Sequence, residues 1–444
     1  MGYGQGWGSN IGAAVQSDPL TLVQPTMTIP IDSETLRGKR VYKPTGSLYG
    51  TRTIKRQLPA VREAQGGLSL EVLPNMVGQL IAWWNGQETV AAVPAPTSLS
   101  ATASSTGTVP SGSNSFKVAP IYTYAGNSQQ YIGPASSSAT ASSTGSEQVG
   151  LTWTAPSSVP TGFTIADYAI YVKRPGQSVW TYLANVGSTT AAYTDTGSLS
   201  PNGVTQPLAA LYHHTFVIAA AAPLTNPLPY ISLVKSLDND HAEWFAGWMI
   251  DEFALNLGNS GEAAKANFNG MALNFGTQAN VSGSPVLEDS AMNWQAHCSV
   301  AGSATNLFEG LTLSAKNGLA YVDGLRGTDY HRAIYPDALR TITGTLQMAH
   351  ENQDQFARLV AEEMFDLSIV VDGSWSHNIV NVGTGVQITP LPTMILDMPT
   401  CAFTEAGGLI NGPKRIVENL PFVTADSTGV DLQIDMFVSQ STFY

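Results

Sequence analysis

The sequence is poor in cysteine, in charge and in long apolar runs. Among 444 residues there are two cysteines, Cys298 and Cys401, and charged residues make up 12%. Two cysteines cannot form a disulfide framework and are too few for a zinc knuckle. We expect two buried free thiols, with one bridge between them as the open alternative. The apolar run Phe216 to Pro223 is far too short to cross a bilayer, and the first residues lack the basic-then-apolar order of a secretory signal. These absences predict a soluble protein, made in a cytoplasm and not inserted in a membrane.

Catalytic and phosphate-binding motifs are missing as well. The sequence has no GxSxG, no HExxH, no GxxxxGK and no GxGxxG after an expected strand. The neighbouring acids Asp251-Glu252 and Glu362-Glu363 would face opposite sides of a strand, which makes them poor acid–base pairs. We therefore expect no enzyme and no cofactor, although a site assembled from distant segments stays open.

Three short polar clusters could hold a cation. They are LDNDH at 237–241, DGSWSH at 372–377 and the pair His213-His214. None has enough ligands at fixed spacing for a calcium loop or a zinc site. Polar turns and partly buried strand histidines are the favoured interpretation, so no metal is expected.

Basic residues are scarce but concentrated. The chain has 20 Lys and Arg against 33 Asp and Glu, a net charge of −13, which argues against tight binding of nucleic acid. Yet the stretch from 37 to 62 contains no acid and eight basic residues: Arg37, Lys39, Arg40, Lys43, Arg52, Lys55, Arg56 and Arg62. A solvated face is the default interpretation. The sharper hypothesis is an interface that meets an acidic surface on another copy of the chain.

Abundant Gly, Ser, Thr and Ala and alternating apolar residues favour an all-β chain. Composition changes abruptly within 94–207, where only six residues are charged. Its LTWTAP, DYAIYVKR and AYTDTG runs are similar to a fibronectin type III or immunoglobulin-like β-sandwich. Because its charge is balanced, we expect a surface decoration, and replacing it by a Gly/Ser linker should leave assembly intact.

The remainder of the chain looks duplicated. Residues 47–84 and 324–360 share one order: an extended segment, a proline, a glycine-led strand and a short amphipathic helix. Gly66 corresponds to Gly344 in this alignment. The landmarks Pro227-Leu228-Pro229 and Pro390-Leu391-Pro392 then precede similar strands, and the strand at 430–438 matches 263–273. Segment 94–207 accounts for the difference in spacing between the copies. The expected organisation is an N-terminal arm at 1–19, a first domain at 20–93 and 208–280, the insert at 94–207, and a second domain at 285–444.

The combination resembles the tail tube proteins of long-tailed, siphovirus-type bacteriophages. The residues that carry the resemblance are SLYGTRTIKRQLPAVREAQGGLSLEVLPNMVGQLIAWW at 47–84, LYHHTF at 211–216, PLPYISLVK at 227–235 and WMIDEFALNLGNSGEAAKANFNGMAL at 248–273. The resemblance implies an antiparallel all-β sandwich or barrel whose long hairpins pair with those of neighbouring subunits. It also implies rings that stack through a long loop into a tube around a channel, in the virion tail.

The resemblance implies partners too: other copies of the chain, a tape-measure protein, tail terminator and distal tail proteins, and viral DNA that passes without tight binding. With two sandwiches per chain, we expect trimeric rings of pseudo-sixfold symmetry. We expect an acidic channel, with Glu71, Asp251 and Glu262 as candidates, since bound DNA would move slowly. The eight basic residues should lie at subunit or ring contacts, and Arg37, Lys39, Arg40 and Lys43 are the candidates for the stacking loop.

Two other functions stay open. A phage adhesion or distal-tail component could hold a bacterial surface glycan through the insert, and even a tube subunit could touch the host weakly there. Its candidate residues are Tyr122, Tyr124, Tyr131 and Trp180, although core packing is the commoner role of strand aromatics. An enzyme such as a glycan hydrolase is the second alternative.

Overall fold

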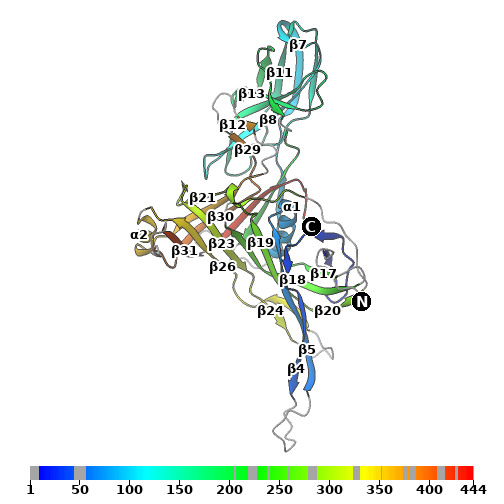
Figure 1. Ribbon diagram of the computed structural model, residues 1–444, viewed down its shortest axis with the longest axis vertical. Helices are drawn as coiled ribbons and strands as arrows, with labels where there is room; N and C mark the ends of the chain where they lie inside the picture. The colour runs from blue at the N-terminus through cyan, green and yellow to red at the C-terminus, as the bar shows by residue number, and fades with distance from the viewer. Residues whose placement is uncertain are drawn as a thin grey trace, which may run out of the picture.

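The computed structural model describes residues 10–44, 57–204, 207–218, 228–237, 241–258, 261–278, 288–323, 331–351, 353–373, 379–380, 387–407, 416–425 and 429–443. Within them the chain is built from strands, nearly all antiparallel, and has two short α-helices, α1 (Pro74–Asn85) and α2 (Asp354–Val360). The all-β class expected from the alternating pattern is confirmed. Figure 1 shows a central body with one elongated projection at each end.

Eight strands form one continuous antiparallel run through the body. In order of pairing they are β4 (Arg37–Pro44), β5 (Gln57–Glu71), β19 (Lys265–Ala272), β18 (Ala242–Leu257), β23 (Phe308–Lys316), β26 (Thr341–Ala349), β31 (Val417–Thr424) and β30 (Met394–Phe403). The consecutive strands β18 and β19 form an antiparallel hairpin. Before this run, residues 20–31 contribute the short strand β2 (Met27–Ile29), which follows a turn at Asp18 and Pro19.

A second layer of strands covers the buried face of this run. On the first half it consists of β1 (Asn10–Gln16), β2, β17 (Tyr230–Ser236) and β20 (Asn274–Gln278), with β3 (Ser33–Glu34) beside β5. On the second half it consists of β21 (Ala296–Val300), β22 (Ser303–Thr305), β27 (Phe365–Val371) and β32 (Leu432–Val438), after a 3-10 turn η2 (Asn293–Gln295). Strands β16 (Tyr212–Ile218) and β6 (Thr89–Ala92) extend it beyond β32, and β24 (Leu319–Val322) pairs with β25 (Ala333–Pro336). The expected arm is thus a paired strand from Asn10 onward.

The two halves of the chain follow the same order of pairing. β5 has β4 and β19 as neighbours, and β26 has β23 and β31. β18 pairs with β17, β19 and β20, whereas β30 pairs with β27, β31 and β32. β17 pairs in turn with β1, and β27 with β21. Each strand of the first set therefore has one counterpart in the second.

These pairings correct two landmarks of the sequence alignment. The Pro227 motif precedes β17, whereas the Pro390 motif precedes β30, which is the counterpart of β18 rather than of β17. The closing strand β32 is likewise the counterpart of β20, and β31 is the counterpart of β19. Prolines mark where a strand begins but not which neighbour it pairs with, so similar motifs fell on different strands.

Gly66 inside β5 and Gly344 inside β26 stand where a side chain would clash with neighbouring residues. A Cβ on Gly66 would lie 2.4 Å from the Thr35 carbonyl oxygen, and one on Gly344 would lie 2.4 Å from the Phe422 ring. Gly66 also has φ +142°, a conformation that side chains rarely adopt. After each glycine the same alternation buries Leu68 and Leu346 in the core.

The two helices differ in burial. α1 begins with Pro74 and ends at Gly86 in the left-handed conformation, and ten of its twelve residues are buried. It packs against β16, β18 and β32, and the Phe443 ring lies against Gly78. α2 has no buried residue. On the apolar face expected for the second helix, Leu359 packs partly against the core, whereas Phe356 and Val360 are exposed in the single chain.

Segment 94–207 forms the upper projection in Figure 1. Its strands are β7 (Thr97–Val109), β8 (Gly112–Tyr124), β9 (Gln130–Ile132), β10 (Ala139–Ser143), β11 (Glu147–Thr154), β12 (Phe163–Lys173), β13 (Thr181–Gly187), β14 (Ala192–Asp195) and β15 (Asn202–Val204). A sheet containing β8 and β12 faces the sheet β14-β11-β7 across a core that includes Phe116, Leu151 and Ile170.

The segment is joined to the second half of the chain. β29 (Gln387–Pro390) pairs in parallel with β9, and β28 (Ile379–Val380) pairs with β29. Ile379 and Ile388 pack with Tyr171 and Trp180 inside the segment. A second apolar cluster brings Tyr122, Tyr131 and Phe163 of the segment against Val370, Leu391, Ile395 and Phe437 of the body. The segment therefore shares core residues with the body, which its balanced charge did not indicate.

Candidate assembly surfaces

Within the strand run, the two halves meet where β18 pairs with β23; outside the run, β16 also pairs with β32. β18 pairs with β23 over six residue pairs, from Glu252 opposite Lys316 to Leu257 opposite Leu311. The Ser314 hydroxyl donates to Glu252 Oε1 at 2.5 Å, and the Asn269 amide donates to Oε2 at 2.9 Å. Burial opposes ionisation of Glu252, but these bonds and the nearby Lys316 ammonium outweigh it and lower its pKa. The joint is thus fastened by side chains as well as by the backbone.

Two side chains of the second half also fasten the end of α1. The Asn317 amide donates to the Trp84 carbonyl at 2.9 Å. Arg340 donates from Nε to Asn317 Oδ1 at 2.8 Å and from Nη1 to Asn85 Oδ1 at 3.2 Å. Its guanidinium lies 5.8 Å from the Trp84 ring centroid, and burial lowers its pKa to about 10. We call Asn317 and Arg340 the helix bracket.

The face of the strand run that points away from the core is polar. One cross-strand row reads Ser69, Asn267, Ala254, Ser314, Thr343 and Val423. All six residues are exposed or half-buried. The charges beside this row face each other in pairs, Glu71 opposite Lys265 and Glu252 opposite Lys316. This polar face has many hydroxyl and amide groups and little net charge.

The three expected channel acids lie in different surroundings. Glu71 ends β5 and accepts a hydrogen bond from the Ser290 hydroxyl. Asp251 sits at the bulge of β18, where its carboxylate accepts the Leu319 N–H at 2.7 Å and burial raises its pKa. Glu262 is exposed in the turn before β19. The Asp251 carboxylate therefore holds the backbone at the start of β24.

The described part of the basic stretch is a strand rather than the expected loop. Arg37, Lys39 and Arg40 lie on β4, where the Arg37 and Lys39 side chains are 68% and 66% exposed. Arg62 lies on the paired strand β5, with its guanidinium 6.0 Å from the Phe275 ring. Lys43 has its backbone in β4. Residues Arg52, Lys55 and Arg56 lie outside the described part of the chain.

The strand run ends at an unpaired edge on both sides, within the residues described. There β4 pairs only with β5. At the other end, Thr404 continues β30 and donates its N–H to the Pro421 carbonyl at 2.8 Å, but its opposite side has no partner strand. Beside this end, the apolar side chains of Phe356, Val360 and Met364 are 49, 69 and 59% exposed.

Two acids, Glu362 and Glu363, follow α2 at the same end and are exposed. They do not lie on a strand, as the sequence reasoning assumed, but in the turn after the helix, where Glu363 pairs with Arg358 at 2.7 Å. Sequence reasoning considered them only as a catalytic pair. Their negative charge, opposite to that of the basic stretch at 37–62, was the sequence signal that could have indicated a contact surface.

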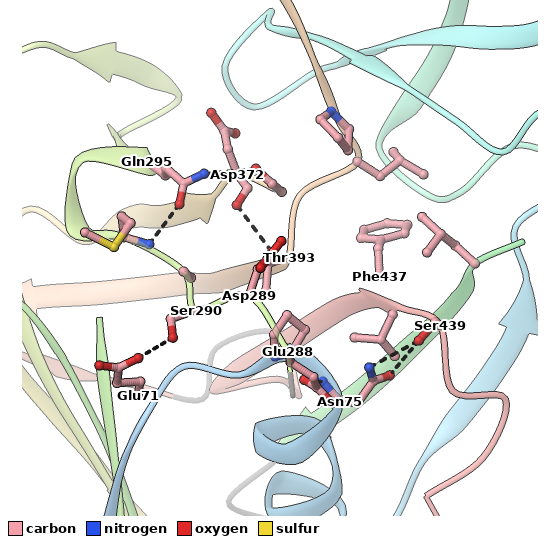
Figure 2. Close-up of a pocket in the computed structure, with 18 of the residues that line it drawn as sticks. Glu71, Asn75, Glu288, Asp289, Ser290, Gln295, Asp372, Thr393, Phe437 and Ser439 are labelled. Carbon is pink, nitrogen blue, oxygen red and sulfur yellow. Dashed lines mark hydrogen bonds between the residues drawn. The ribbon is translucent and has the colours of Figure 1, made fainter. Parts of the chain in front are cut away.

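A cavity of about 780 Å³ lies between the start of α1, residues 288–295 and the residues around Leu391 and Phe437 (Figure 2). One wall is acidic and consists of Glu71, Glu288, Asp289 and Asp372. The other includes Leu208, Leu211, Leu391 and Phe437. Among its described lining residues there is no Lys or Arg. Asp372 is held by His297 Nε2 at 2.8 Å, and this bond raises the histidine pKa.

The aromatic residues on which a glycan site would depend are packed inside. Tyr122 and Tyr131 are fully buried, and the Tyr124 ring lies 4.9 Å from that of Phe163. Trp180 is 9% exposed, with the Lys117 and Lys173 ammonium groups 5.3 and 5.2 Å from its ring. The glycan-binding alternative therefore loses its candidate residues.

The other polar candidates are structural in the described residues. His213 binds Asp435 at 2.7 Å, and the fully buried His214 contacts Glu88, so the interpretation as strand histidines is confirmed. Both cysteines are free and buried, and burial raises each thiol pKa to about 12. Residues 238–240 and 374–378, which hold most of the polar clusters at 237–241 and 372–377, lie outside the described residues.

No group of three metal-ligating side chains occurs among the residues that the structure describes. Neither described helix is long and apolar enough to cross a membrane. A family model for the phage tail tube protein matches residues 6–423. A search of curated proteins gave no match. The family-model match spans nearly the whole chain, across both halves of the strand run and segment 94–207. The chain therefore belongs to the phage tail tube protein family and is a structural subunit of the virion tail.

Proposed function

We propose that each chain supplies two tube units and that three chains close one ring of a siphovirus-type tail tube. The first unit is β4-β5-β19-β18, and the second is β23-β26-β31-β30. The matching order of pairing in the two halves supports this division. Segment 94–207 interrupts the first unit, and its two facing sheets favour an immunoglobulin-like insert.

The joint between β18 and β23 is the observation that carries the proposal. There a strand of the first proposed unit pairs antiparallel with a strand of the second. Repeating that step around an axis removes the unpaired edges at both ends of the run, which are otherwise prone to uncontrolled pairing. Three chains with eight strands each supply 24 strands. Strand number, tilt and diameter are linked in a closed barrel, so the ring has a fixed size.

The polar face of the strand run would line the channel. Its opposite face is buried in the core, and its own charges are paired. DNA binding strengthens with each phosphate that a Lys or Arg neutralises. A face of hydroxyl and amide groups, with each Lys opposite a Glu, offers DNA little such binding. This proposal replaces the acidic channel by a nearly neutral one that passes DNA and accommodates a tape-measure protein.

Stacking would use the two ends of the molecule. The β4–β5 hairpin projects away from segment 94–207 (Figure 1). The acidic cavity is lined in part by Leu208 and Leu211, which directly follow that segment. The hairpin connection contains Arg52, Lys55 and Arg56. Its positive charge complements the acidic cavity of a chain in the next ring. The terminal rings would contact the tail terminator and distal tail proteins through the same two ends.

Segment 94–207 serves in this proposal as a brace on the outer body, with at most weak contact to a host surface, and the chain has no catalytic role. The mass per unit length of purified tubes, combined with the ring spacing, tests the ring composition. Three chains per ring support the proposal, and six chains per ring refute it.

A further inference from the structure

We propose that β4 of one chain pairs antiparallel with the continuation of β30 in the next chain, in the register of the internal joint. This places Lys39 opposite Thr404 of the neighbouring copy. The inference rests on the three-chain ring proposed above. Its basis is that β23 is the counterpart of β4 and β30 the counterpart of β18, so that the internal joint is a template for the contact between chains.

The register on β4 follows from the glycines. Gly344 of β26 lies opposite Leu313 of β23. Gly66 of β5 is its counterpart, and the register of β4 places Leu36 opposite it, next to the pair Arg37 and Gln65. Leu36 and Leu313 are both buried. Counting three residues onward from each, Lys39 takes the place of Lys316, so the same residue type stands at both joints.

The register on β30 follows from the other side of the same glycines. Gly66 lies opposite Gly270, which lies opposite Ile250 on β18. Gly344 lies opposite Phe422, which lies opposite Phe403 on β30.

Ile250 and Phe403 are both buried. On β18 the bulge at Asp251 makes Glu252 the next paired residue, opposite Asn269. On β30 the next residue is Thr404, which bonds to Pro421. Thr404 is therefore the counterpart of Glu252, and the joint of Glu252 with Lys316 becomes Thr404 with Lys39.

The contact at the helix end repeats with added charge. Arg340 lies four residues before Gly344, and Arg62 lies four residues before Gly66. Asn85, which Arg340 binds, lies nineteen residues after Gly66, and Glu363 lies nineteen residues after Gly344. Arg62 of one chain would thus reach Glu363 of the next, where an arginine–carboxylate pair replaces the internal arginine–amide bond.

The proposed pairing between chains also explains why α2 is exposed in the single chain. Within one chain, α1 is buried partly by residues of the second half, including Phe443 and the helix bracket. α2 has no such cover in the single chain, and Phe356, Val360 and Met364 stay exposed. A neighbouring chain at this joint would bury an apolar patch that is otherwise unfavourable in water. The acidic and apolar end of one chain then meets the basic end of the next.

Paired cysteines test the register. Residues directly opposite each other in an antiparallel pair have Cα atoms about 4.5–5.5 Å apart, within the reach of a disulfide. The full-length double variant Lys39→Cys with Thr404→Cys is assembled, oxidised and run on a denaturing gel without reductant. Both native thiols are buried, so the introduced cysteines are the accessible ones. A covalent species of three chains is expected, and each single variant should give monomer.

A matched pair shifted by two residues, Lys39→Cys with Ala406→Cys, should link at least tenfold less at the same oxidation time. Efficient linking of the shifted pair would overturn the register. So would the absence of cross-linking by the in-register pair in tubes of normal appearance. Neither result would contradict the three-chain ring. Covalent rings of six chains would instead overturn the proposed ring, because they require a different closure.

Discussion

Glu252 and Lys316 lie directly opposite each other on strands from different halves of the chain, with Oε1 and Nζ 3.5 Å apart. The pair sits on the polar face, where Ser314 and Asn269 also hold the carboxylate. It therefore fastens one proposed tube unit to the next and neutralises two charges on the face that would line the channel. The contact between neighbouring chains is expected to follow the same pattern.

Replacing Glu252 by Gln should make the stability of the chain less dependent on pH in the acidic range. The pKa of Glu252 is lowered from its ordinary 4.5, so its contribution is fully present above about pH 4.5 and is lost as pH falls through the lowered value. The difference in Tm between wild type and E252Q should be largest at neutral pH and shrink towards pH 3. Glu262→Gln, at an exposed turn, is the control. A Tm difference that is the same at every pH would contradict this role.

Reversing Arg62 should block ring closure, and reversing Glu363 should restore it. Arg62→Glu places a negative charge against Glu363 of the neighbouring chain, so tubes should be lost while the monomer stays folded. The double variant with Glu363→Arg restores an opposite-charge pair, and tubes seen by negative-stain microscopy should return. Arg332→Glu makes the same charge change at an exposed position and should assemble normally. If the double variant fails to assemble while both single variants are folded, Arg62 and Glu363 do not contact each other in the tube.

Removal of segment 94–207 should destabilise the body, contrary to the expectation from sequence. Its deletion uncovers Val370, Leu391, Ile395 and Phe437, and burying an apolar side chain of this size contributes about 1.5–3 kcal/mol. It also leaves β29 without β9. We expect aggregation, and partial recovery of soluble protein when Phe437 is also changed to Ser. Normal tubes from the simple deletion would show that the shared core is dispensable.

Reversing charge in the acidic cavity should stop stacking without affecting single rings. Glu288→Lys with Asp289→Lys opposes the basic hairpin of the next ring, so isolated rings should accumulate, especially at low salt where charge repulsion is least screened. Further changes of Arg52 and Lys55 to Glu in the same chain should restore tubes. Tubes of normal length from the Glu288 and Asp289 variant would place the stacking contact elsewhere.

Local features of the fold could be predicted from the sequence, whereas its long-range partners could not. The alternation around Leu68 and Leu346 and the glycines before them revealed two related strands, because steric limits act on neighbouring residues. The Pro227 and Pro390 motifs misled the alignment, since a strand start does not determine its neighbour. β29 pairs with β9 across more than 250 residues, and no local pattern encodes such a pairing.

For the candidate surfaces, too, the residue types could be predicted from the sequence but their positions in the fold could not. The charge of the basic stretch was evident in the sequence, but its placement on a strand edge depends on the pairing of Arg37 with Gln65. The acids expected in the channel were chosen by charge alone. Pairing places Lys265 opposite Glu71, and the bulge turns Asp251 towards Leu319. Neither arrangement can be recognised without the register.

A reconstruction of the assembled tube by cryo-electron microscopy, at a resolution that separates strands, tests the central claim most directly. We predict three chains per ring, with β4 of each chain beside the continuation of β30 from its neighbour and Lys39 opposite Thr404. A ring of six chains, or a different strand beside β4, would contradict the account.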